Sequence, residues 1–138
     1  MRCRTNRYAE RQRRYNLAVS VLLADDSEHF RKALRRCFEG QSEIGVVGEA
    51  VDFSDAVRLV EQLRPDVVLL DLRMNDGHGL DALAAAPALI STGATILAMS
   101  FSADDDAKAL AKQIGAAKLL DKMSLYTELI PTIFAIEK

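Results

Sequence analysis

The chain has 138 residues, 49% of them hydrophobic, and a formal net charge of -2, which suits one compact domain with a single core. Its two cysteines, Cys3 and Cys37, form neither a disulfide framework nor a metal-spaced set, which favours a reducing cytosol. No apolar run approaches the roughly 18 residues of a membrane span, and no signal-peptide core follows the basic N-terminus, so we expect a cytoplasmic protein without membrane contact.

Residues 1–16 form a basic arm with six arginines against one glutamate. Tyr8 and Tyr15 are interleaved with the arginines, and such a segment can hold a nucleic-acid backbone or an acidic partner. A flexible tail is the favoured alternative, because this composition is typical of disordered termini. We therefore assign the folded domain to residues 17–138.

Beyond the arm, short apolar runs alternate with segments of helical period. The run 18–24 is too short and too rich in β-branched residues for a buried helix, which indicates a strand. The next segment carries one apolar stripe from Phe30 to Phe38, and Gly40 ends this predicted helix. The same alternation predicts strands at 44–48, 67–70, 95–99 and 118–120, and helices at 53–63, 80–86, 103–114 and from 125 onward.

This alternation predicts the fold class. Fully apolar strands indicate a parallel sheet covered on both faces, because each crossover between parallel strands returns over one face. We expect a doubly wound α/β domain with five strands and five helices. Proline removes a backbone hydrogen bond, so Pro87 is expected to end its helix and Pro131 to kink or shorten the last one.

Polar side chains follow the predicted strands at their carboxyl ends. They are Asp25 and Asp26 after the first strand, Asp71 after the third, Ser100 after the fourth, and Asp121 and Lys122 after the fifth. In open α/β sheets these ends lie on one edge, where ligands bind. Carboxylates that converge there repel one another, and a divalent cation relieves the repulsion. Mg²⁺ fits better than a transition metal, because the ligands are hard oxygens and no His or Cys occupies these strand ends.

Asp71, central in the predicted sheet, is placed to attack phosphorus and form an aspartyl-phosphate. Mg²⁺ would neutralise the phosphoryl oxygens, Lys122 would supply a point charge, and Ser100 would donate a hydrogen bond. The alternative is that such residues only cap helices, as Asp26 or Ser27 can for the first helix. Finding these residue types at four separate strand ends favours an active site over helix capping alone.

These residues resemble the receiver domain of two-component response regulators, over about residues 17–137. Asp25 and Asp26, Asp71, Ser100 and Lys122 stand at the acidic pair, phosphoacceptor, hydroxyl and lysine positions of that family. The segments VVGEA at 46–50 and RPDVVLLD at 64–71 look like the NarL/LuxR type, whose members usually carry a C-terminal DNA-binding helix-turn-helix.

The resemblance implies a flavodoxin-like sheet with strand order 2-1-3-4-5. It also implies phosphoryl transfer to Asp71 from the phosphohistidine of a histidine kinase. The implied Mg²⁺ ligands are Asp26, Asp71 and the backbone carbonyl of Arg73, with Asp25 contributing through water.

Four positions depart from the family pattern, and three of them lie in or next to the predicted strand ends and their loops. Asn75 stands where proline is common, and Met123 follows Lys122 where a cis proline is frequent. We expect a trans bond before Met123, because a non-proline cis bond costs about 3 kcal/mol. Leu119 replaces the aromatic switch residue, so a Tyr or Phe rotamer change coupled to Ser100 cannot operate.

Phe101 follows Ser100 where the family usually has a small residue. One hypothesis is that its ring screens the acyl phosphate from water and from bulky phosphodonors, which slows both loss and gain of phosphate. Ordinary packing of a bulky aromatic side chain is the alternative.

We expect a phosphorylation-dependent signalling switch consisting of a receiver alone, not an enzyme acting on a separate substrate. Its expected partners are a histidine kinase or phosphotransfer protein, and its output is a protein contact or a phosphorylation-dependent homodimer.

One alternative is the truncated regulatory part of a NarL/LuxR-type transcription factor, and the chain's stop at Lys138 without a linker argues against it. DNA would be a partner only if an output domain or the arm contributes. Another alternative is a pseudo-receiver that binds partners without phosphate.

Overall fold

The computed structural model describes residues 19–74 and 80–136, so the basic arm and Asn75 lie outside the described residues. Within them, five parallel strands form one sheet in the order β2-β1-β3-β4-β5, and the predicted fold class and strand order are confirmed. The strands are β1 (Val19–Ala24), β2 (Ile44–Ala50), β3 (Val67–Asp71), β4 (Thr95–Ser100) and β5 (Lys118–Asp121). The helices are α2 (Glu28–Cys37), α3 (Phe53–Leu63), α4 (Leu80–Ile90), α5 (Asp105–Gln113) and α6 (Leu125–Ile136), with a 3₁₀ turn η2 (Lys122–Ser124) before α6. Among the described helices, none is long and apolar enough to cross a membrane.

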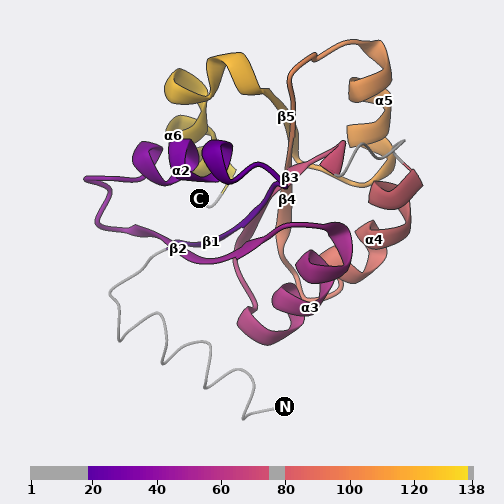
Figure 1. Cartoon of the computed structure of the whole chain (residues 1–138), viewed down its shortest axis with the longest axis horizontal. Coiled ribbons are helices and arrows are strands. Elements are labelled where there is room, and N and C mark those ends of the chain that lie inside the picture. The colour runs from indigo at the N-terminus through magenta and orange to yellow at the C-terminus, as the bar shows by residue number, and fades with distance from the viewer. Residues whose placement is uncertain (1–18, 75–79, 137–138) are drawn as a thin grey trace.

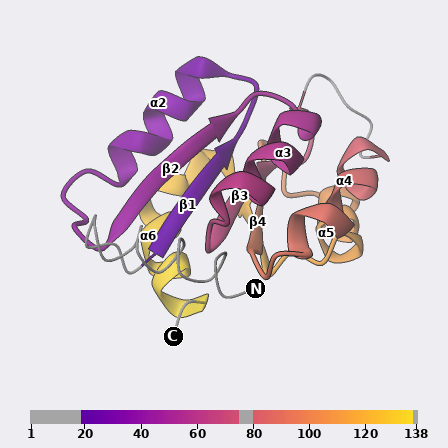
Figure 2. The same ribbon diagram turned by 90° about the horizontal axis from the view of Figure 1, so that it is seen from below.

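Both faces of the sheet are buried. Helices α2 and α6 cover one face and α3, α4 and α5 cover the other (Figures 1 and 2). Along β3, Val68 and Leu70 enter the core under α3, α4 and α5, whereas Val67 and Leu69 enter the core under α2 and α6. All four side chains are fully buried. Because β3 is buried on both faces, its sequence is a continuous apolar run.

Side-chain caps fix where several helices begin. Ser27 caps α2 by accepting a hydrogen bond from a backbone N–H three residues later, at 3.1 Å. Asp52 caps α3 in the same way at 2.7 Å, and Asp104 caps α5 at 2.9 Å. The cap of α2 is therefore Ser27 rather than Asp26.

The prediction that Pro87 ends its helix is wrong. Helix α4 continues through Pro87 to Ile90, and α6 likewise runs through Pro131 to Ile136 without an early end. Both prolines are exposed, so water can replace the helical donor that each proline lacks. On the buried sides of these helices, Leu89 and Ile133 are fully covered. Burial of these apolar faces outweighs the loss of one backbone hydrogen bond in each helix.

An ion-pair network joins α2 to β2. The Nε atom of Arg31 lies 2.7 Å from Glu49 Oε1, and the Nε atom of Arg35 lies 2.5 Å from Glu49 Oε2. Arg31 also donates from Nη1 to the backbone carbonyl of Asp25 at 2.7 Å. Burial acts to raise the pKa of Glu49, but hydrogen bonds and charges from Arg35 and Arg31 together outweigh it and lower that pKa. The network therefore ties the helix to the end of β1, where Asp25 lies.

The continuation of α4 beyond Pro87 can be tested with two adjacent residues. Leu89 is fully buried, whereas Ile90 is 43% exposed. We expect Leu89→Ala to lower the free energy of unfolding by about 2–5 kcal/mol, because it leaves a cavity, and Ile90→Ala to lower it by about 1 kcal/mol or less. Chemical denaturation of both variants measures the difference. Equal losses would mean that the helix does not place Leu89 on the sheet.

The Glu49 network predicts a pH-dependent contribution to stability. A carboxyl group whose pKa is lowered in the folded state stabilises the protein above its unfolded-state pKa, and this stabilisation is lost as the pH falls through the folded-state value. Glu49→Gln should therefore be less stable than wild type by about 1 kcal/mol at neutral pH. The difference should shrink on acidification to about pH 3.

Urea unfolding of wild type and Glu49→Gln across that pH range measures this difference. Glu61→Gln, which alters an exposed carboxylate on α3, is the control and should change little at any pH. A stability difference for Glu49→Gln that does not vary with pH would contradict the proposed ionic contribution.

Candidate functional site

Three charged side chains meet at the carboxyl ends of β1, β3 and β5. Asp25 follows β1, Asp71 is the last residue of β3, and Lys122 begins η2 after β5. The Nζ atom of Lys122 donates to Asp25 Oδ2 at 2.6 Å and lies 3.2 Å from Asp71 Oδ2. Asp25 is fully buried, and Asp71 and Lys122 are each 8% exposed. The structure therefore brings these three predicted residues together at one edge of the sheet.

Backbone hydrogen bonds orient both carboxylates. Asp25 Oδ1 accepts from the N–H of Ser27 at 2.9 Å, and Asp71 Oδ1 accepts from the N–H of Arg73 at 3.1 Å. Each carboxylate thus directs one oxygen to the chain that follows it and the other to Lys122. The N–H of Leu72 donates to a β4 carbonyl at 3.1 Å, so β3 stays paired with β4 up to the point where Asp71 emerges.

The 3₁₀ turn η2 presents Lys122 to the site. Asp121 accepts a hydrogen bond from the N–H of Met123 at 2.8 Å and so caps this turn. The described residues contain no cis peptide bond, which confirms the expected trans bond before Met123. The carboxylate of Asp121 therefore caps the turn, whereas the ammonium of Lys122 contacts Asp25 and Asp71.

The pKa of Asp71 is raised, and burial is the main cause. The positive charge of Lys122 and the N–H of Arg73 act in the opposite direction, while the negative charge of Asp25 adds to the rise. The charged form of Asp71 is therefore incompletely compensated by its protein neighbours. A cation bound beside it would favour the carboxylate form.

A third carboxylate completes an acidic cluster. Asp25, Asp26 and Asp71 each offer an oxygen, and these atoms lie within 4.8 Å of one another. Asp26 is exposed, so the cluster opens to solvent on one side. Hard oxygen donors around a solvent-accessible position suit Mg²⁺, which usually keeps several waters. The donor set fits a hard divalent cation, and the backbone carbonyl of Arg73 as a further ligand stays a prediction.

Ser100 lies at the same edge of the sheet and is buried, but its hydroxyl is turned to its own loop. Its Oγ donates to the carbonyl of Ser102 at 2.9 Å and accepts from the N–H of Ser102 at 3.3 Å. Among the described residues, no hydrogen bond joins it to Asp71. In this state Ser100 therefore stabilises the connection between β4 and α5.

Two aromatic rings contact the ammonium group of Lys122. Its Nζ atom lies 4.3 Å from the ring centroid of Phe30 and 4.8 Å from that of Phe101. The sequence singled out Phe101, which is 64% exposed and so is not a core residue. The sequence pattern did not identify Phe30 as a site residue. Phe30 belongs to the apolar stripe of a helix, and nothing in that pattern distinguishes it from a core residue.

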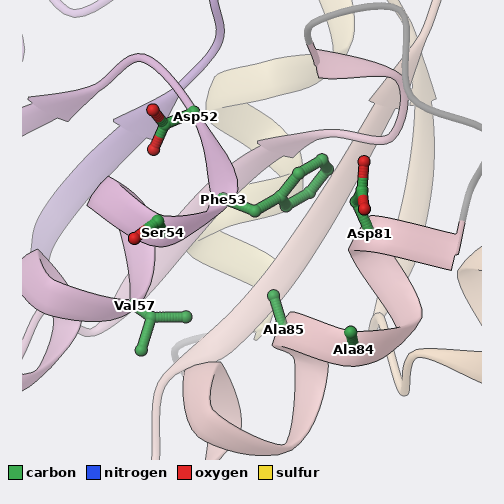
Figure 3. A pocket seen from close by; sticks show the side chains of 7 residues that line it. All are labelled: Asp52, Phe53, Ser54, Val57, Asp81, Ala84 and Ala85. Carbon is green, nitrogen blue, oxygen red and sulfur yellow. The ribbon is translucent and has the colours of Figure 1, made fainter.

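A separate hollow lies between α3 and α4, with a volume of about 400 Å³. Figure 3 shows the ring of Phe53 extending from α3 toward the helix that carries Asp81 and Ala85. None of the predicted site residues lines this hollow. It is therefore distinct from the acidic cluster.

Comparison with known proteins places these observations in a family. The model of the response regulator receiver domain matches residues 21–134. The transcriptional regulatory protein LiaR of Bacillus subtilis is 38% identical over 120 residues, which cover 87% of this chain and 56% of LiaR. A protein-glutamate methylesterase/protein-glutamine glutaminase of Paramagnetospirillum magneticum is 37% identical over 91 residues, 62% of this chain and 26% of that protein.

Solved structures agree with the sequence comparisons. The receiver domain of the putative response regulator NarL from Mycobacterium tuberculosis is 32% identical, with a TM-score of 0.76 over 88% of this chain and 97% of that one. A LuxR-family response regulator from Aurantimonas sp. SI85-9A1 is 29% identical, with a TM-score of 0.75 over 86% and 84% of the two chains.

The chain spans little more than half the length of LiaR and about a quarter of the methylesterase. The matched region contains all the strands and the acidic cluster described above, except for the first two residues of β1. The chain belongs to the family of response regulator receiver domains, the phosphorelay modules of two-component systems.

Proposed function

We propose that Asp71 accepts a phosphoryl group from the phosphohistidine of a histidine kinase or phosphotransfer protein. The observation that carries this proposal is the placement of a buried carboxylate within reach of both Lys122 and two further carboxylates. In the transfer, an oxygen of Asp71 bonds to phosphorus as the bond from phosphorus to the imidazole nitrogen breaks. The electron pair of the broken bond stays on the histidine.

Lys122 and a bound cation would together supply the positive charge that the transferred group needs. Bound Mg²⁺ would neutralise phosphoryl oxygens, and Asp25, Asp26, Asp71 and the Arg73 carbonyl are the residues proposed to hold it. Lys122 already touches two carboxylates, so its ammonium can pair with a phosphoryl oxygen through a small movement. The protein residues are thus arranged before the phosphodonor arrives.

Ser100 links phosphorylation to a change of shape. To donate to a phosphoryl oxygen on Asp71, its hydroxyl must give up the hydrogen bond to the carbonyl of Ser102. That exchange loosens the connection between β4 and α5 and biases two states of the surface formed by α5, β5 and α6. The output is then a protein contact or a homodimer specific to the phosphorylated state.

A second candidate function is regulation of transcription as one part of a longer DNA-binding protein. The similarity to LiaR favours it, because LiaR is named as a transcriptional regulatory protein and this chain corresponds to 56% of it. DNA would then be bound outside the receiver, by an output domain or by the arm at residues 1–16.

We propose a cytoplasmic location and a receiver spanning residues 17–138, with no catalysis on a separate substrate.

The phosphoacceptor can be identified by intact mass. After treatment with a small phosphodonor and Mg²⁺, wild type should gain the mass of one phosphoryl group, and Asp71→Asn should gain none, because the amide cannot act as the nucleophile. The matched control is Asp104→Asn, since asparagine keeps the cap of α5. It should be phosphorylated as wild type is.

Two results would contradict this proposal. A mass gain that survives in Asp71→Asn would remove Asp71 from its role. A wild-type protein that binds Mg²⁺ and gains no mass would favour the phosphate-independent pseudo-receiver.

A further inference from the structure

Phe30 and Phe101 come from different elements and meet above Lys122. Phe30 lies on α2, and Phe101 lies in the connection between β4 and α5. Their ring centroids are 6.0 Å apart with an interplanar angle of 63°, an edge-to-face contact. The ammonium of Lys122 lies over both rings, at 4.3 Å and 4.8 Å from their centroids.

This aromatic pair covers part of the ammonium of Lys122. The lysine side chain is only 3% exposed, although Phe101 itself is 64% exposed. An exposed ring that contacts a buried ammonium has one side in solvent and the other on the site. Because the same ammonium lies 3.2 Å from Asp71, the two rings are next to the proposed phosphoacceptor.

The loop that carries Phe101 is itself closed by hydrogen bonds. Ser100 and Ser102 flank Phe101 and bond to each other through the Oγ of Ser100. When the Ser100 hydroxyl turns to a phosphoryl oxygen, it loses its bond to the Ser102 carbonyl, and the ring is then held over the site by its contacts with Phe30 and Lys122. On the other side, Phe30 is partly buried and packs against the core under α2 and α6.

We propose that Phe30 and Phe101 form an aromatic lid that limits the access of water and of phosphodonors to Asp71. This inference rests on the proposed function of Asp71. Hydrolysis requires a water oxygen to bond to phosphorus while the bond from phosphorus to Asp71 breaks, with the electron pair left on the carboxylate and a proton released to solvent. The lid occupies space beside that phosphorus and restricts the approach of water and of phosphodonors, so it slows both loss and gain of the phosphoryl group.

The test compares dephosphorylation half-lives after removal of excess phosphodonor, measured by intact mass. Phe101→Ala should shorten the half-life by about two- to fivefold, because the exposed ring no longer restricts the approach of water to the phosphoryl group. Phe30→Ala should act in the same direction. The double variant should fall short of the product of the two single effects, because each ring depends on the other for its position.

Tyr126→Ala is the matched control, since Tyr126 is 70% exposed and its ring is not among the contacts of Lys122 in the described structure. Its half-life should equal that of wild type. Phe30→Leu keeps apolar bulk in the core and replaces Phe30→Ala if thermal unfolding shows that variant to be unfolded.

The outcomes separate this inference from the function on which it rests. Faster phosphoryl loss in the Phe101 and Phe30 variants, with an unchanged Tyr126 variant, supports the lid. A wild type that is phosphorylated on Asp71, with unchanged half-lives in both phenylalanine variants, overturns the lid and leaves the phosphoacceptor role intact. Absence of phosphorylation in wild type overturns the proposed function itself.

Discussion

The contact of one lysine with two buried carboxylates is the interaction on which the site depends. Lys122 lies 2.6 Å from Asp25 and 3.2 Å from Asp71, and removing one partner of such a buried pair typically costs about 3–5 kcal/mol. The arrangement remains unbalanced, because burial raises the pKa of Asp71 in spite of the opposing charge of Lys122. The proposed divalent cation would offset the negative charge of the carboxylates and prepare the site for the proposed phosphoryl transfer.

The rest of the fold holds these charges in place. Burial of β3 on both faces fixes the backbone from which Asp71 emerges, and pairing with β4 continues through Leu72. Arg31 binds the carbonyl of Asp25 and links it to Glu49 on β2. Rigid supports of this kind reduce the reorganisation that phosphoryl transfer would otherwise require.

The sequence was sufficient to predict the sheet, its strand order and the convergence of Asp25, Asp71 and Lys122. Apolar runs and the geometry of parallel strands predict the sheet and the shared edge at which these residues converge, whereas the strand order followed from the resemblance to receiver domains. Pro87 misled the prediction, because burial of α4 on the sheet outweighs a local breaker. The contact of Phe30 with Lys122 and the bond of Ser100 to Ser102 depend on the rotation of a helix and the path of a loop, which periodicity does not encode.

The most direct measurement is the effect of Mg²⁺ on thermal stability. A cation that binds only the folded site raises the Tm by mass action, so wild type should melt at a higher temperature in Mg²⁺ than in a chelator. Asp26→Asn should reduce this rise, because Asp26 is an exposed member of the cluster, whereas Asp105→Asn on α5 should leave it unchanged. A Tm that does not respond to Mg²⁺, or an equal rise in Asp26→Asn, would contradict the claim that these carboxylates form a cation site.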